Sequence, residues 1–221
     1  MHQHASSRAP YLSLRNGIRS TRGVVRSDVD VKRWVERDPS TNEVRPARCP
    51  DCGVAARPTG GKLVLHGHGR RGRQLRGPPS PGEKSETREF RSRRFRCTKC
   101  GALLTVVPCE TLTRRLYSGP AIALALALFG LSLLPPKVIR SQLSPWAAVG
   151  ATAAASWCTI GRWVSAARAG TLFSCARRAP EGWTDRQVAE RVATTLATYV
   201  LPTADPPGLA ERAFFGAALA R

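Results

Sequence analysis

The sequence predicts an α+β protein with a small β unit first and a helical unit after it. Two Cys-x-x-Cys-Gly motifs, at residues 49–53 and 97–101, bracket a segment rich in arginine, glycine and proline, which is typical of short strands joined by turns. From Pro120 onward the composition changes to Ala, Leu and Trp at helical spacing. The length of 221 residues suits one or two small domains, but not a large catalytic domain with several recognition modules.

The charge of the chain predicts a polyanionic partner. There are 35 Lys and Arg residues against 15 Asp and Glu residues, a net charge of +20, and residues 1–119 carry most of the excess. Nucleic acid is the simplest partner for such a chain, and an anionic membrane surface is the lesser alternative. Arg outnumbers Lys by 30 to 5, which suits bidentate contacts to phosphate or guanine but is also what codon bias in a GC-rich genome produces.

Residues 1–44 are predicted to be a basic and largely disordered tail. No acidic residue precedes Asp28, and the first 27 residues fit a tail, a transit peptide or an extended start of translation. The seven cysteines are an odd number, and four of them are paired at metal-ligand spacing. This usage favours metal in a reducing compartment over disulfides, and no secretory signal precedes the motifs, so we expect a cytoplasmic protein.

Residues 45–116 are predicted to form a zinc ribbon. Each cysteine motif places two thiolates on a tight turn, and Gly53 and Gly101 supply the positive φ that such a turn often needs. A closed tetrahedral shell of four thiolates leaves no position for water, so we expect the metal to fold the domain and not to catalyse. Iron in the same site and a thioredoxin-like redox pair remain as alternatives. The predicted zinc ligands are Cys49, Cys52, Cys97 and Cys100.

The segment between the motifs is a basic insert with too few apolar residues to fold alone. Residues 57–99 carry 13 basic and 3 acidic side chains, and Gly-Pro-Pro-Ser-Pro-Gly interrupts them at residues 77–82. We therefore expect a loop or a hairpin held by the flanking motifs, with strands at residues 89–96 and 102–108. His66 and His68 are either further metal ligands or solvated residues of a basic turn. The remaining cysteines, Cys109, Cys158 and Cys175, are expected to be small buried residues.

Arginines of this insert and of the second motif are the candidate phosphate contacts. An alternative role is to offset the charge of −2 that four thiolates and one Zn²⁺ carry. The candidates are Arg70, Arg71, Arg73, Arg76, Arg91, Arg93 and Arg94.

Residues 117–170 are predicted to form three helices. The apolar run 121–134 lies between prolines, and fourteen residues are too few to cross about 30 Å of hydrocarbon, so we expect a buried helix and no membrane partner. A second helix is expected at residues 136–143, and a third begins after Ser156 as N-cap. Residues 171–221 are predicted to add packing helices, the first with a capping box at Thr184 and a stripe that ends at Tyr199.

The order of these motifs resembles the N-terminal recognition region of bacterial insertion-sequence transposases, and a set of uncharacterised bacterial proteins made of that region alone. The resemblance covers residues 45–170 and includes Arg-Phe-Arg-Cys-Thr-Lys-Cys-Gly, Thr-Val-Val-Pro and Arg-Arg-Leu-Tyr. It implies a helix-turn-helix whose third helix enters the major groove, with Thr159 and Arg162 at the bases. Residues 144–155 are longer than the usual turn of such a motif.

The combined prediction is a zinc-dependent, DNA-binding protein of a mobile element, without a catalytic domain of its own. Double-stranded DNA is the expected partner, with a homodimer or a partner transposase chain as further partners. No phosphate-binding Gly-x-x-x-x-Gly-Lys-Ser/Thr motif is present, and the few acidic residues after the ribbon do not suit a two-metal nuclease. An RNA-binding zinc-ribbon protein and a membrane-surface or protein-interaction adaptor are the alternatives.

Overall fold

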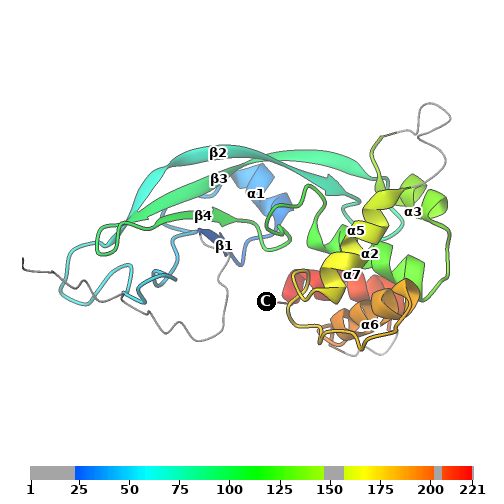
Figure 1. The fold of residues 1–221 in the computed structure, drawn as a ribbon. Coiled ribbons are helices and arrows are strands. Elements are labelled where there is room, and N and C mark those ends of the chain that lie inside the picture. The colour runs from blue at the N-terminus through cyan, green and yellow to red at the C-terminus, as the bar shows by residue number, and fades with distance from the viewer. Residues whose placement is uncertain (1–22, 147–156, 202–205, 221) are drawn as a thin grey trace, which may run out of the picture.

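The computed structural model describes residues 23–146, 157–201 and 206–220. Within these ranges a four-stranded sheet is followed by helices, so the mixed α+β class is confirmed (Figure 1). No helix in these ranges is long and apolar enough to cross a membrane. The elements are β1 (Val24–Arg26), α1 (Val31–Arg37), β2 (Leu65–Gly77), β3 (Glu86–Cys97), β4 (Leu103–Val107), α2 (Gly119–Gly130), α3 (Pro136–Leu143), α5 (Cys158–Arg168), α6 (Asp185–Ala197) and α7 (Leu209–Leu219).

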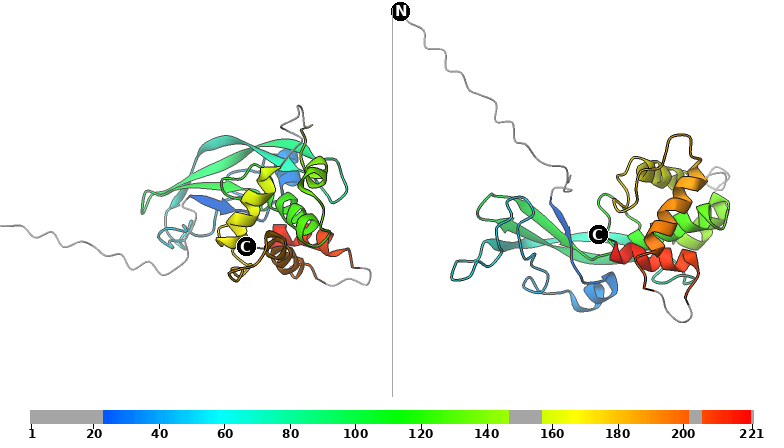
Figure 2. Two further views of the ribbon diagram at one scale, coloured as in Figure 1. Left: turned by 45° about the vertical axis from the view of Figure 1, so that its right-hand side comes forward. Right: turned by 90° about the horizontal axis from the view of Figure 1, so that it is seen from below.

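The sheet has the strand order β1-β4-β3-β2. β2 and β4 run antiparallel to β3, and β1 runs parallel to β4. The basic insert is therefore a long hairpin of β2 and β3, which extends from the cysteine motifs to the helices (Figure 1, Figure 2). Its turn contains the proline and glycine residues of 77–82, which stop strand pairing.

A β-bulge in this hairpin decides which face of the sheet the arginines of β2 occupy. The register shifts between Gly67 and Arg70, where β2 has one residue more than β3. Gly69 has a φ of 89°, a conformation that glycine adopts without strain. Because side chains alternate between the two faces, the extra residue moves Arg71 and Arg73 to the face opposite the one that a regular strand would give them.

Residues 23–44 form β1 and α1, so the prediction of a largely disordered tail over residues 1–44 is wrong for this part. Residues 1–22 lie outside the described residues. α1 buries Val31 and Trp34, and its N-cap Asp30 accepts a hydrogen bond from a backbone N–H of the first turn. Only Val31 and Trp34 of this helix are buried, and charged residues surround them in the sequence. The helix therefore needs the sheet to bury these side chains, and the composition of the segment alone does not predict it.

Trp34 fixes α1 to the sheet. Its side chain is 1% exposed, and its Nε1 donates a hydrogen bond of 3.0 Å to the carbonyl of Arg91. Its ring meets the ring of Phe90 edge-on, at 6.2 Å between centroids. β4 pairs with β3 only between Arg93 and Arg96, so Arg91 lies beyond that pairing, and the tryptophan satisfies a carbonyl that β4 does not reach.

The apolar run predicted to be a buried helix is α2, the central helix of the helical unit. It packs most extensively against α6 and α7, and α3 and α5 also contact it. The close approach of α2 and α7 to α6 depends on glycine. A Cβ on Gly216 of α7 would overlap the backbone of Leu196, and a Cβ on Gly130 of α2 would overlap the backbone of Glu190. The described helices from α2 to α7 share one hydrophobic cluster. The predicted boundary between residues 117–170 and 171–221 is therefore wrong, because α2 is apolar on all sides and needs partners from both segments.

Local signals locate some helix ends correctly, although α2 ends at Gly130 and does not extend through the predicted run to residue 134. α3 has the predicted bounds, and the capping box of α6 is confirmed by mutual hydrogen bonds between Thr184 and Gln187. α5 begins at Cys158, while its predicted cap Ser156 lies outside the described residues. Tyr199, predicted on the stripe of α6, lies beyond the end of that helix and is partly exposed.

The far end of the hairpin is bonded to the helical unit. The backbone N–H of Arg76 donates to the carbonyl of Leu116 at 2.7 Å, and the N–H of Ser118 donates to the carbonyl of Arg76 at 2.9 Å. The buried hydroxyl of Ser85 donates to the carbonyl of Leu143 at the end of α3, at 2.7 Å. The hairpin thus connects the cysteine motifs with the helices.

Candidate metal centre and basic surface

The two cysteine motifs adopt the same backbone turn. In the first motif, the N–H of Gly53 donates to the carbonyl of Cys49 at 2.8 Å. In the second motif, the N–H of Gly101 donates to the carbonyl of Cys97 at 2.9 Å. The φ angles of the two glycines are 69° and 77°, as the sequence predicts. The second turn joins β3 to β4, while the first belongs to the segment before β2.

The four cysteine side chains of these turns meet at one point. Their Sγ atoms all lie within 4.8 Å of one another. The Cys49 and Cys100 sulfurs are 3.7 Å apart, and those of Cys52 and Cys97 are 3.8 Å apart. A tetrahedral Zn²⁺ with bonds of about 2.3 Å requires sulfurs about 3.8 Å apart, so the set fits such an ion. We call Cys49, Cys52, Cys97 and Cys100 the cysteine cluster.

The predicted alternative ligands His66 and His68 are not part of this cluster. Both are exposed, and Nε2 of His66 lies 2.8 Å from the carbonyl of Leu63. Among the described residues, the cysteine cluster is the only group of three or more His, Cys, Asp or Glu side chains placed to hold a metal ion. The remaining cysteines differ from expectation, because Cys158 is exposed at the start of α5 and the other two are half-buried.

Backbone amides prepare one thiol of the cluster for ligation. Burial raises the pKa of Cys97, but hydrogen bonds from the backbone N–H groups of Cys100 and Lys99 outweigh it and lower that pKa to about 7. The pKa of Cys49 is raised, chiefly because burial disfavours its thiolate. A metal ion would supply the positive charge that such a buried thiolate needs.

Arg93 is a structural residue, so its predicted role as a phosphate contact is wrong. The side chain is 1% exposed, and its Nε donates to the carbonyl of Pro39 at 2.7 Å. Its Nη2 donates to the carbonyl of Asp38 at 2.8 Å and pairs with the carboxylate of that residue at 2.9 Å. The sequence identifies Arg93 as basic, but it does not show that the side chain meets Asp38 and Pro39 at the end of α1.

Two other candidates are also engaged within the protein. Nη1 of Arg70 pairs with the second carboxylate oxygen of Asp38 at 2.5 Å, which offsets its charge. The guanidinium of Arg76 lies 5.7 Å from the centroid of the Trp146 ring. Arg91 is exposed, but it lies on the opposite face of β3 from Arg94.

The remaining arginines gather on one face of the hairpin. Arg71 pairs with Ser92 and Arg73 with Phe90 across the strands, so the alternation of side chains places both arginines on the same side of the hairpin as Arg94. Phe90 and Ser92 are themselves buried on this side, and Arg73 and Arg94 are half-buried beside them. Arg96 is not among the predicted phosphate contacts, but it belongs to the same face because it is two residues from Arg94 along β3. Within the described ranges these side chains have no salt bridge to an acid. We call Arg71, Arg73, Arg94 and Arg96 the arginine face.

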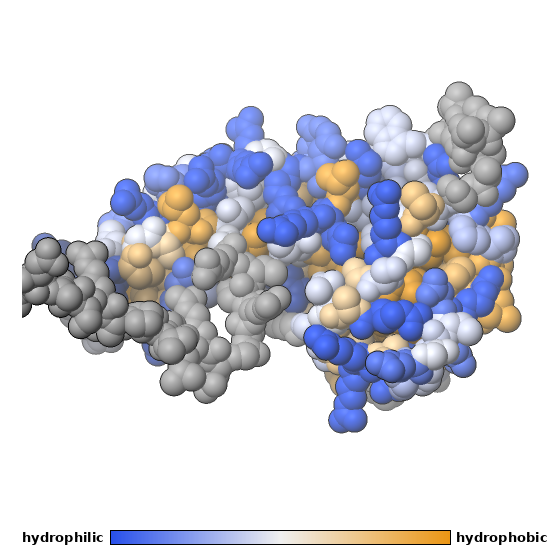
Figure 3. Space-filling view, viewed as in Figure 1, coloured by the Kyte–Doolittle hydropathy of each residue, from blue (hydrophilic) through white to orange (hydrophobic). Residues whose placement is uncertain are grey.

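The electrostatics of this face favour a bound anion. Burial lowers the pKa of Arg73, and the positive charge of Arg71 lowers it further. The two guanidinium groups therefore repel each other in partly desolvated surroundings, and an anion between them would relieve that repulsion. Hydrophilic side chains cover much of the upper surface along the hairpin (Figure 3).

The stripe of α5 is buried as predicted, with Ile160, Trp163 and Val164 in the core. Of the two candidate base contacts on this helix, Arg162 is exposed and Thr159 is half-buried. No salt bridge holds Arg162 within the described ranges. The residues of the predicted turn before α5 lie largely outside the described residues.

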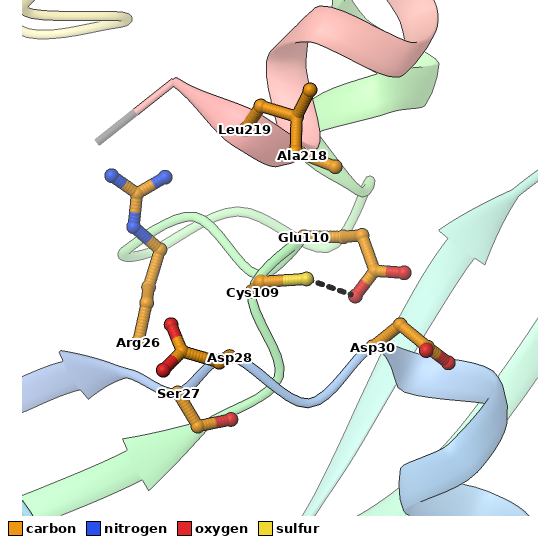
Figure 4. Close-up of a pocket in the computed structure, with 8 residues that line it drawn as sticks. All are labelled: Arg26, Ser27, Asp28, Asp30, Cys109, Glu110, Ala218 and Leu219. Atoms are coloured by element: carbon orange, nitrogen blue, oxygen red, sulfur yellow. Dashed lines mark hydrogen bonds between the residues drawn. The ribbon is translucent and has the colours of Figure 1, made fainter.

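A cavity of about 500 Å³ lies between the residues that follow β1, those that follow β4, and the end of α7 (Figure 4). Within it, Oε2 of Glu110 accepts a hydrogen bond from the backbone N–H of Val31 at 2.9 Å, and the thiol of Cys109 lies 3.4 Å from the same oxygen. Burial raises the pKa of Glu110 and raises that of Cys109 to about 12. Glu110 thus links the end of the sheet to the first turn of α1. The lining residues are Arg26, Ser27, Asp28, Asp30, Cys109, Glu110, Ala218 and Leu219.

Comparisons of the chain with protein-family models, with curated proteins and with solved structures give no match. The resemblance to the recognition region of transposases therefore rests on the sequence motifs alone.

Proposed function

We propose that this chain is a zinc-stabilised nucleic-acid-binding protein that contacts backbone phosphates through its arginine face. The observation that carries the proposal is the gathering of Arg71, Arg73, Arg94 and Arg96 on one face of β2 and β3, without acidic partners in the described ranges. Guanidinium groups form bidentate hydrogen bonds with phosphate, and a set of unneutralised ones attracts a polyanion. The net charge of +20 supports the same class of partner.

Zinc is the metal that the four-thiolate set favours, and its role in the proposal is structural. The ion would join the turn between β3 and β4 to the turn at residues 49–53, and so would fix the base of the hairpin that carries the arginine face. Four protein ligands fill a tetrahedral shell, and such closed sites contribute folding free energy.

Duplex DNA is the partner that we propose first, for a protein of a mobile element that acts without a catalytic domain of its own. Its support is the sequence resemblance together with the exposed Arg162, which lies in the N-terminal half of the helix that would enter the major groove. Thr159 is half-buried and supports this less strongly. RNA is the alternative, because a basic hairpin contacts its phosphates by the same chemistry.

The test is a selection of bound sequences from random duplex DNA, performed with zinc-loaded protein and repeated after a chelator removes the metal. An enriched motif that disappears without zinc would support sequence recognition dependent on the cysteine cluster. Substitution of Arg162 by Ala should then relax the motif at one position. Contacts to bases determine which sequence is bound, whereas contacts to phosphates only orient the protein on the duplex. If the protein captures no DNA and no RNA at low salt, the proposal is wrong.

A further inference from the structure

Trp146 is an exposed tryptophan at the junction of the hairpin and the helices. Its side chain is 60% exposed, whereas Trp34, Trp157 and Trp163 are buried. An exposed indole offers a large flat surface on which another flat group can stack. The ring is therefore a candidate ligand contact if its surroundings favour one.

The backbone holds Trp146 in a defined place. The hydroxyl of Ser144 accepts a hydrogen bond from the N–H of Trp146 and donates one to its carbonyl, both at 3.3 Å. Leu143, one residue before this turn, accepts the buried hydrogen bond of Ser85 from the hairpin. The ring is thus carried on a turn that is fixed to the end of the hairpin.

Arg76 covers part of the ring and adds positive charge. Its guanidinium lies 5.7 Å from the ring centroid, and its backbone is bonded on both sides to residues 116 and 118. The arginine is therefore positioned before any ligand arrives. A ring with a cation against it and most of its surface in water can stack a further flat group.

From this geometry we infer that Trp146 and Arg76 form a stacking site for an unpaired nucleobase. The inference rests on the proposed function and adds a ligand to it. The base must be unpaired, because a duplex keeps its bases stacked inside while a single strand or loop exposes them. Arg76 lies on the side of the hairpin opposite Arg71 and Arg73, so the local positive charge at the ring comes from Arg76 itself, and the net charge of +20 attracts a strand with phosphates. Glu89, on the same face of the hairpin as Arg76, is bonded to Gln74 at 2.9 Å. The site takes bases of any identity, because every base has a flat face.

The test compares a single-stranded 12-nucleotide DNA with a 12-base-pair duplex, using the full chain loaded with zinc. Trp146→Ala should weaken single-strand binding about 10-fold, as loss of one base–aromatic stack does, and leave duplex binding within about 2-fold. Trp146→Phe should restore most of the loss. Phe215→Ala is the matched control, since Phe215 is another exposed aromatic residue, on α7, and it should change neither affinity.

Fluorescence provides a second measurement that does not depend on affinity. Single-stranded DNA should quench the emission of the wild-type protein, and Trp146→Phe should abolish most of that quenching while binding persists. Equal losses on both DNAs, or no loss on the single strand, would overturn the stacking site while leaving the proposed function intact. Absence of binding to either DNA by the wild-type protein would overturn both.

Discussion

Arg93 and Asp38 form an ion pair of 2.9 Å between β3, an inner strand of the sheet, and the residue that ends α1. The arginine is buried, while the aspartate is partly exposed and also pairs with Arg70. The pair therefore joins a segment early in the sequence to the hairpin. It also shows that Arg93 has a structural role, unlike the arginines that have no acidic partner.

This pair predicts that Arg93→Ala destabilises the fold. The substitution removes bonds to Pro39 and Asp38 and leaves two carbonyls without their donor, so we expect the free energy of unfolding to fall by about 3 kcal/mol. Arg71→Ala, on the opposite face, should change it by less than about 0.5 kcal/mol. Urea denaturation measures both, and equal effects of the two substitutions would refute the structural role of Arg93.

Metal content should follow the cysteine cluster. Cys52→Ser removes one ligand, so we expect the purified protein to lose most of its zinc and to unfold at a lower temperature. Cys158→Ser is the matched control, because that cysteine is exposed and lies outside the cluster. Elemental analysis should find one zinc per chain in the wild type and in the control. Iron in place of zinc, or the same loss in the control, would contradict this assignment.

Deletion of Gly69 tests the bulge without changing the charge. A hairpin without the extra residue would restore regular alternation and move Arg71 and Arg73 to the other face. We therefore expect affinity for nucleic acid to fall by at least about 10-fold while the net charge stays at +20. Gly69→Ala, which retains the length of the strand, should bind more tightly than the deletion. If the deletion variant binds as the wild type does, total charge and not its placement determines affinity.

Glu110 should make stability depend on pH. Burial raises its pKa in the folded state, so the folded state favours the protonated form more than the unfolded state does. Its contribution to stability is therefore fully present below the unfolded pKa and is lost as the pH rises through the folded value. Glu110→Gln retains an oxygen acceptor for Val31 but cannot ionise. In urea denaturation at a series of pH values, we expect this variant to gain stability relative to the wild type as the pH rises above the ordinary pKa of a carboxyl group. A constant difference between the two proteins at every pH would contradict this.

Short-range signals in the sequence predicted the cysteine cluster and most of the helices. The two Cys-x-x-Cys-Gly turns and the capping box at Thr184 are local motifs, and each has the geometry that its residues require. The burial of Trp34 depends on a strand far along the chain, so composition could not reveal it. Likewise, alternation along β2 gives the wrong face for Arg71 unless the bulge is known.

The boundary between the helical segments shows the same limitation. The low polarity of α2 indicates a buried helix, but it does not say which helices bury it. Gly130 of α2 and Gly216 of α7 both approach the backbone of α6, at Glu190 and at Leu196. They become visible only when the backbones are close together in space.

The salt dependence of binding tests whether the arginine face contacts phosphates. The comparison is between the wild type, a variant with Ala at Arg71, Arg73, Arg94 and Arg96, and a control that loses the same charge at four exposed cations elsewhere. Each phosphate contact contributes about 0.9 to the slope of log K against log salt on duplex DNA, so the first variant should lose a slope of up to about 3.6. The control, with Ala at Lys62, Lys84, Arg177 and Arg178, should retain most of the wild-type slope. An unchanged slope in the first variant, or an equal loss in the control, would contradict phosphate binding at the arginine face.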